Sequence, residues 1–223
     1  MTVSGSSPMP DSIEFKTFES RQEASDALAA ELASVLGSAL AERGRASLVV
    51  SGGSSPVQMF RALGSAPLAW ENVTVVPSDE REVPLDHADR NEAMIRRELM
   101  TGDADRASMV SLHPPGDIPS RFDAVVLGMG SDGHTASLFP GSPDLESAIA
   151  SPGTLARLNV PRLGVHRISL TPGALLATTR LFLLFFGNEK RDVFERARAA
   201  GDASEYPVRT VLHLSLIHIS EPT

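Results

Sequence analysis

The stretch GMGSDGHTASLFP, residues 128–140, directly follows the apolar run FDAVVL of residues 122–127. The apolar run is typical of a buried strand, whereas three glycines, an aspartate and a histidine suit neither helix nor strand. Glycines here indicate backbone conformations or close approaches that a Cβ would forbid, and Asp132 and His134 are titratable groups separated by one residue. We therefore interpret this stretch as a functional loop at the carboxyl end of a strand.

Strand-like and helix-like segments alternate on both sides of this loop. The apolar spacing over residues 21–43 predicts a long amphipathic helix. Further helices are predicted over residues 57–63 and 91–100 and further strands over 46–50 and 72–79, while residues 167–199 are interpreted as strand, turn, helix, strand, loop and helix. This alternation predicts an α/β fold with a doubly wound, mostly parallel sheet and helices on both faces. In such sheets, ligands bind outside the carboxyl ends of the strands.

The composition limits the class of protein. The 223 residues are 42% hydrophobic and 22% charged, which is typical of a globular chain with a sizeable core. A formal net charge of -8 disfavours a nucleic-acid binder, because affinity for the phosphate backbone needs clustered Lys and Arg. Cysteine is absent, which excludes disulfides and Cys-based metal sites and is compatible with a reducing cytoplasm.

The sequence predicts one domain over residues 1–213. Residues 1–14 are rich in Ser and Pro and predict a ragged arm, without the basic and apolar regions of a secretory signal. The longest apolar run, residues 181–186, is far shorter than the ~20 residues of a membrane-spanning helix and is interpreted as a buried strand. We therefore expect a cytoplasmic protein with no membrane partner. Residues 214–223, LSLIHISEPT, continue none of these patterns and are interpreted as a non-native tail.

Other loops after predicted strands carry groups that suit a phosphate. The loop SGGSSP, residues 51–56, offers backbone N–H groups, hydroxyls and the start of a helix, although alone it is equally compatible with a plain strand-to-helix turn. It has neither the Walker nor the dinucleotide-binding spacing. Arg81 in SDEREVP and Lys190 in GNEK add cations at the same predicted sheet edge. On sequence alone, Lys190 could equally be a surface lysine of a helix.

His134 is the strongest candidate for catalysis. A lone histidine is more often structural, but one in a glycine-rich loop at a strand end, two positions after Asp132, is placed for general base work at neutral pH. His87, His113 and His166 lack that setting. No pair of histidines has HExxH spacing, which disfavours a metal site, and no GxSxG elbow of a serine nucleophile is present. We expect neither a metal nor a cofactor.

Five motifs, in this order, resemble those of one family: SGGSSP (51–56), DEREVPLDHADRN (79–91), LGMGSDGHTASLFPGSP (127–143), RISLTPGAL (167–175) and FFGNEK (185–190). The sequence resembles the glucosamine-6-phosphate isomerases and 6-phosphogluconolactonases, and within them the lactonases. The third motif is long and highly specific, and the second is nearly so. The resemblance implies the fold of glucosamine-6-phosphate deaminase, a hexose 6-phosphate ligand, and metal-free hydrolysis of 6-phospho-D-glucono-1,5-lactone to 6-phospho-D-gluconate in the oxidative pentose phosphate pathway.

The resemblance also implies residue roles. His134 would activate water against the lactone carbonyl, with Asp132 in its immediate environment. Arg81 and Lys190 would hold the phosphate together with the amides of residues 52–55, and Arg167 would add positive charge. The expected catalytic residues are His134 and Asp132, and the expected substrate-binding residues are Ser51, Gly52, Gly53, Ser54, Ser55, Asp79, Arg81, Asn91, Gly130, Arg167 and Lys190.

Two alternatives remain at this point. The first is a deaminase-like isomerase, but the deaminases carry an acidic group five residues after the histidine, where this chain has Phe139, and an apolar ring cannot transfer a proton. The second is a non-catalytic sugar-phosphate-binding module, although such regulators usually carry a DNA-binding segment.

This chain also has Arg90 where many relatives have serine. We expect a carboxylic ester hydrolase acting on a small sugar phosphate, with a monomer as the default because the sequence carries no signal of oligomeric state.

Overall fold

The computed structural model describes residues 14–212, so residues 1–13 of the predicted arm and the whole predicted tail lie outside the described residues. The helix predicted over residues 21–43 is α1 (Arg21–Arg43), and those predicted from residues 57 and 91 are α2 (Val57–Gly64) and α3 (Asn91–Glu98). The hydroxyl of Ser20 caps α1 by accepting the N–H of Glu23, and Gly44 ends the helix with φ 69°.

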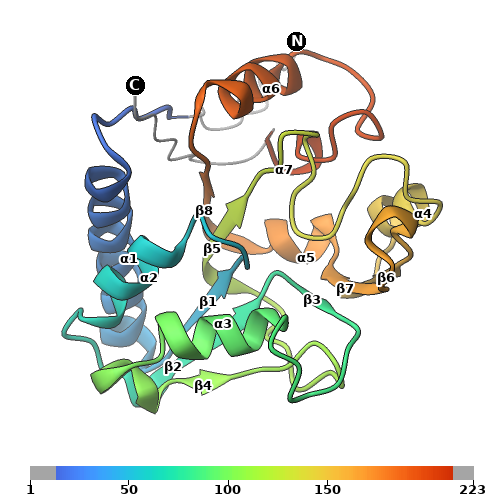
Figure 1. Cartoon of the computed structure of the whole chain (residues 1–223). Helices are drawn as coiled ribbons and strands as arrows, with labels where there is room; N and C mark the ends of the chain where they lie inside the picture. Colours follow the sequence, from blue (N-terminus) through green and yellow to red (C-terminus); the bar gives the residue numbers. More distant parts are fainter. Residues whose placement is uncertain (1–13, 213–223) are drawn as a thin grey trace, which may run out of the picture.

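Five parallel strands form the central sheet in the order β4-β2-β1-β5-β8 (Figure 1). They are β1 (Ala46–Val50), β2 (Val73–Pro77), β4 (Ser108–Met109), β5 (Phe122–Gly128) and β8 (Thr178–Leu184). The chain moves from β1 outward to β2 and β4, and then to β5 and β8 on the other side of β1. The predicted doubly wound, mostly parallel fold is confirmed, and its switch point lies between β1 and β5.

Helices cover both faces of this sheet. Successive residues of a strand point to opposite faces, so Val50 and Val126 pack in one core with α1, α2 and α3. Val49 and Val125 pack in the other core with α5 (Pro172–Leu176), α6 (Asn188–Arg198) and α7 (Arg209–Leu212). The central strands β1, β2 and β5 are thus buried on both faces, which explains why they are nearly continuous apolar runs.

A second, antiparallel sheet has the order β3-β7-β6, with strands β3 (Asp79–Arg81), β7 (Arg167–Leu170) and β6 (Leu155–Leu158). The sequence pattern did not predict this sheet. The strand predicted over residues 72–79 ends at Pro77, and Ser78 donates its N–H to Val50 while its carbonyl accepts the N–H of Leu170. The chain therefore passes from one sheet to the other at Ser78. A small cluster beneath the second sheet joins Leu158 to α4 (Leu145–Ala150).

By length and composition, α1 is apolar enough to cross a membrane, with a mean hydropathy of 1.2 over its most apolar stretch. The apolar residues of α1 serve the protein core instead, because Leu28, Leu32 and Leu36 are fully buried between α1 and the sheet. Within the described residues, α1 is a core helix.

Candidate active site

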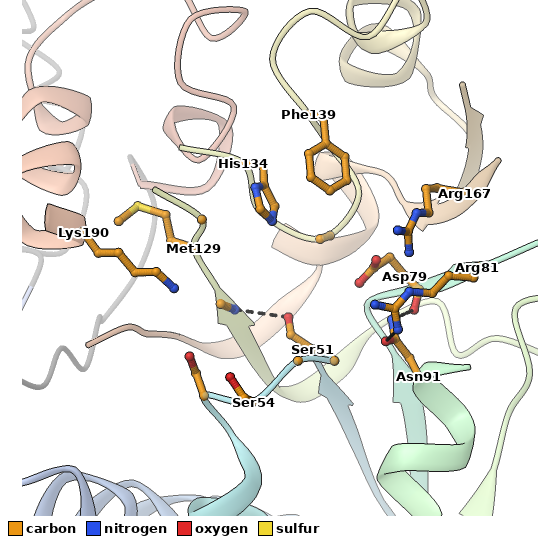
Figure 2. Close-up of a pocket in the computed structure, with 16 residues that line it drawn as sticks. Ser51, Ser54, Asp79, Arg81, Asn91, Met129, His134, Phe139, Arg167 and Lys190 are labelled. Carbon is orange, nitrogen blue, oxygen red and sulfur yellow. Dashed lines mark hydrogen bonds between the residues drawn. The ribbon is translucent and has the colours of Figure 1, made fainter. Parts of the chain in front are cut away.

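A cavity of about 280 Å³ opens at the carboxyl ends of β1, β5 and β8, where the sequence predicts the site (Figure 2). Twelve of the thirteen predicted site residues line it, and Asp132 is the exception. Four lining residues were not predicted, although all lie in the stretch of residues 128–140. The lining consists of Ser51, Gly52, Gly53, Ser54, Ser55, Asp79, Arg81, Asn91, Gly128, Met129, Gly130, His134, Ala136, Phe139, Arg167 and Lys190.

The loop after β1 forms one wall of the cavity. The hydroxyl of Ser51 accepts the N–H of Gly128 at 3.2 Å, which ties this loop to the end of β5. A Cβ on Gly52 would lie 2.0 Å from Oδ1 of Asn91, so a glycine is required where the Asn91 amide crosses the loop. Gly53 has φ 90°, a conformation that favours glycine. The two predicted glycines are thus needed for different reasons, one for close approach and one for backbone conformation.

The loop after β5 is folded tightly around the His134 ring. A Cβ on Gly130 would lie 2.2 Å from Nδ1 of His134, and the N–H of Gly130 donates to the His134 carbonyl at 3.0 Å. Gly133 has φ 78°, and a Cβ there would lie 2.5 Å from the ring of Tyr206. The hydroxyl of Thr135 donates to the Gly128 carbonyl at 2.9 Å and closes the loop. These contacts answer why the sequence has several glycines here: the loop can wrap the histidine only without side chains at these positions.

His134 and Asp132 form a close pair. Nδ1 of His134 lies 2.5 Å from Oδ1 of Asp132, and Asp132 also accepts a hydrogen bond from Arg162. Partial burial favours a higher pKa for the Asp132 carboxyl, but the hydrogen bonds from His134 and Arg162 outweigh it and hold this pKa well below its usual range. An ionised carboxylate only accepts hydrogen bonds, so Nδ1 of His134 carries a proton, and in the neutral imidazole Nε2 is then the nitrogen that can accept one. Asp132 lies outside the cavity lining and contacts the ring through Nδ1.

Phe139 packs against the His134 ring, with centroids 4.1 Å apart and planes inclined by 32°. The guanidinium of Arg162 lies over the Phe139 ring, 5.3 Å from its centroid. Arg162 comes from the connection between β6 and β7, and no sequence signal marked it. The Phe139 ring limits the orientation of the imidazole and shields one side of it, and Arg162 holds this arrangement through its contacts with Phe139 and Asp132.

Two arginines meet at one end of the cavity. Arg81 and Arg167 are register partners on β3 and β7, so their side chains leave neighbouring strands at the same level. Burial and the nearby charge of Arg81 lower the pKa of Arg167, and its buried Nε has no hydrogen-bond partner among the described residues. Like charges in this arrangement are stabilised by an anion between them.

Lys190 reaches the cavity from the first turn of α6. Figure 2 shows it on the side opposite Arg81 and Arg167, with Ser54 between the two groups of cations. Burial and the charge of Arg21 lower the pKa of Lys190. Cations therefore face the loop after β1 from both sides, in the arrangement that an anion over this loop would need.

Asp79 carries a chain of hydroxyl contacts that the sequence did not reveal. Its carboxylate accepts hydrogen bonds from Ser78 at 2.8 Å and from Ser137 at 2.6 Å, and Ser78 in turn lies 3.0 Å from the Ser51 hydroxyl. Ser137 and Asp79 are 58 positions apart, so only the fold brings them together. The contacts hold Asp79 at the cavity wall, with 8% of its surface exposed.

The sequence profile of the glucosamine-6-phosphate isomerase/6-phosphogluconolactonase family matches residues 19–217. A 6-phosphogluconolactonase of Pseudomonas aeruginosa is 40% identical over 93% of this chain and 94% of its own length. One from Neisseria meningitidis serogroup A is 39% identical over 88% of this chain and 92% of its own length.

Solved structures agree with these sequence matches. A 6-phosphogluconolactonase from Shewanella baltica superimposes with a TM-score of 0.89 at 32% identity, covering 96% of this chain and 99% of that one. A monomeric glucosamine-6-phosphate deaminase superimposes with a TM-score of 0.73 at 17% identity and shares the fold.

Proposed function

The chain belongs to the glucosamine-6-phosphate isomerase/6-phosphogluconolactonase family, and from this membership we propose how it hydrolyses 6-phospho-D-glucono-1,5-lactone to 6-phospho-D-gluconate in the pentose phosphate pathway. His134 is the general base, Asp132 holds its tautomer, and the cations of the cavity hold the phosphate. The observation that carries this mechanism is the His134–Asp132 pair at the mouth of a cavity that gathers Arg81, Arg167 and Lys190.

The base acts through Nε2. With Nδ1 bound to Asp132, Nε2 accepts a proton from a water molecule as the water oxygen attacks the lactone carbonyl. The tetrahedral intermediate then collapses, the bond from the carbonyl carbon to the ring oxygen breaks, and the imidazolium returns its proton to that leaving oxygen. Asp132 stays ionised and stabilises the transient imidazolium. A lactone is an activated ester, so one positioned base, worth about 10²–10⁴-fold, is a large share of the acceleration needed.

The phosphate anchors the substrate away from the reacting carbonyl. Arg81, Arg167 and Lys190 provide the charge, and the N–H groups of residues 52–55 provide hydrogen bonds from the loop after β1. Asp79 and Asn91 face the cavity next to Arg81 and offer polar groups for the sugar hydroxyls. Binding at the phosphate end orients the ring, which converts binding energy into positioning at His134.

Phe139 weighs against the deaminase alternative. It occupies the position where the deaminases carry the acidic group for ring opening, and its ring packs on His134 without a group that could carry a proton. We expect no release of ammonia from glucosamine 6-phosphate under conditions in which the lactone is hydrolysed.

The organisation of the chain remains part of the proposal. We propose a single domain over residues 1–213 and a monomer in the cytoplasm that binds no nucleic acid or membrane. The net charge of -8 supports the absence of a nucleic-acid partner, and the absence of cysteine is compatible with a reducing cytoplasm. No metal or cofactor is needed for the mechanism above, so EDTA should leave the rate unchanged.

The test compares the wild type with His134→Ala. Lactone loss is followed directly and corrected for spontaneous hydrolysis, and binding of 6-phosphogluconate is measured by calorimetry. We expect kcat to fall by about 10²–10⁴-fold, with the affinity for 6-phosphogluconate nearly unchanged, because the phosphate is held elsewhere. Near wild-type turnover in the variant would refute the assignment of His134 without affecting the family.

A further inference from the structure

Arg90 is the largest buried charged side chain near the site that takes no part in lining the cavity, with 1% of its surface exposed. Its guanidinium donates to the carbonyls of Val83 at 3.3 Å and His113 at 3.0 Å and to Oε1 of Glu92 at 2.9 Å. It thereby connects the segment after β3, the segment after β4 and the first turn of α3. A buried cation with this many partners fixes the backbone around it.

Glu80 is the buried anion that faces Arg90. Its carboxylate is fully buried and lies 3.8 Å from Nε of Arg90. It accepts the backbone N–H groups of Arg81 at 2.7 Å, Asn91 at 2.8 Å and Glu92 at 2.9 Å. Because Arg90 is the N-cap of α3 and provides no side-chain cap, Glu80 satisfies the free N–H groups at the start of this helix. Glu80 thus joins β3 to α3.

The residues on either side of Arg90 hold the cationic side chain of Arg81. Nη1 of Arg81 donates to the Asp89 carbonyl at 2.7 Å and to Oδ1 of Asn91 at 2.5 Å. The Asn91 amide donates to the Asp79 carbonyl at 2.6 Å and lies against Gly52 of the loop after β1. The direction of Arg81 into the cavity therefore depends on where the backbone of residues 89–91 lies.

We propose that Arg90, through its pair with Glu80, is a positioning residue for substrate binding: it fixes residues 89–91 so that Arg81 points at the substrate's phosphate and Asn91 at its hydroxyls. This inference rests on the proposed function of the cavity. Arg90 should therefore affect substrate binding and not the catalytic base. The loop that carries His134 follows β5 and makes no hydrogen bond or ion pair with Arg90 among the described residues.

The experiment uses Arg90→Met, which keeps the apolar stem and removes the guanidinium. We expect KM for the lactone to rise about tenfold or more, comparable to the loss of one charge-assisted hydrogen bond, while kcat stays within about threefold. Arg90→Lys retains the charge opposite Glu80 but cannot reach both carbonyls and Glu92, so its KM should fall between those of the wild type and Arg90→Met.

Leu36→Ala is the matched control for destabilisation, because Leu36 is fully buried in the core of α1, remote from the cavity lining. It should lower the melting temperature and leave KM unchanged. The proposal is overturned if folded Arg90→Met has the wild-type KM, or if Leu36→Ala raises KM as much. If Arg90→Met does not fold, a wild-type KM in Arg90→Lys overturns it and a raised KM supports it.

A second readout separates this inference from the proposed function. Calorimetry with 6-phosphogluconate should show weaker binding to the Arg90 variants than to the wild type. If the wild type binds 6-phosphogluconate but does not accelerate lactone hydrolysis, the proposed function fails while the binding comparison still tests Arg90. If the wild type hydrolyses the lactone and Arg90→Lys and Arg90→Met bind the product normally, only the role of Arg90 fails.

Discussion

Asp132 lies outside the cavity, and in the proposed mechanism it sets the tautomer of His134 inside it. In Asp132→Asn, the amide can present either an oxygen or an N–H to Nδ1 of His134, so the ring loses its fixed tautomer and the charge that stabilises the imidazolium. We expect kcat to fall by about 10²-fold or more with little change in KM, measured by steady-state kinetics. An unchanged kcat would mean that packing against Phe139 suffices to orient the ring.

The same carboxylate should leave a signature in stability against pH. Because its pKa is lower in the folded chain than in the unfolded chain, its ionised form stabilises the fold above the unfolded value of about 4, and this contribution is lost as the pH falls through the folded value. The difference in unfolding free energy between the wild type and Asp132→Asn should therefore shrink as the pH falls below about 4. Urea unfolding from pH 7 to pH 3 measures it, and a difference that grows in acid would contradict the prediction.

Whereas the charge of Asp132 raises the stability of the fold, the charge of Lys190 lowers it. Burial and the charge of Arg21 lower its pKa, so the unfolded chain binds the proton more tightly, and the resulting penalty is present at neutral pH and relieved as the pH rises toward the usual lysine pKa. Lys190→Met should melt no lower than the wild type at pH 7 without ligand, and any gain should vanish near pH 10. Its KM should rise about tenfold or more. A lower melting temperature with an unchanged KM would make Lys190 structural.

The sequence was enough to find most of the polar residues that line the cavity, for a reason that particular residues make clear. His134, Asp132 and Gly130 share one short stretch, and Arg81 and Lys190 each follow a strand, so local spacing was enough to find them. Arg162 reaches Asp132 across 30 positions, and Ser137 reaches Asp79 across 58. These contacts arise from the pairing of β3, β7 and β6, which no local pattern encodes.

Among the helices and strands, those with long apolar periodicity were predicted closely and those defined by pairing were not. The bounds of α1 agree with the prediction because its caps, Ser20 and Gly44, adjoin the apolar pattern. β3 is three residues long and reads Asp-Glu-Arg, which in sequence is typical of a solvated turn. It is a strand because its backbone pairs with β7 and because Glu80 is neutralised inside the protein by Arg90 and by backbone N–H groups.

The loop after β1 gives a test of how elements are fitted together. In Gly52→Ala, the new Cβ would fall on the Asn91 amide, so this side chain must turn away and Arg81 loses one of its two hydrogen-bond acceptors. We expect KM to rise about tenfold with a smaller effect on kcat. Gly173→Ala is the control, because a Cβ in α5 meets only the Thr171 hydroxyl at 3.9 Å, and alanine favours the helix by about 0.5–1 kcal/mol. Equal KM values in the two variants would exclude the close approach as the reason for Gly52.

For the chain as a whole, a net charge of -8 surrounds a cavity in which Arg81, Arg167 and Lys190 converge. An anionic ligand relieves the repulsion among these cations, so 6-phosphogluconate should stabilise the fold. At 100 times Kd, the expected gain of about 2.7 kcal/mol corresponds to a rise in melting temperature of about 5–11 °C for a chain of this size. Gluconate, which lacks the phosphate, should give little shift at the same concentration. At the same concentration the rise should be about half as large in Arg81→Ala if its affinity falls about tenfold, and fully retained in His134→Ala, because only the first variant removes a phosphate contact. If gluconate stabilised the protein as much as 6-phosphogluconate, the affinity would come from the polyol, and the cations would need another explanation.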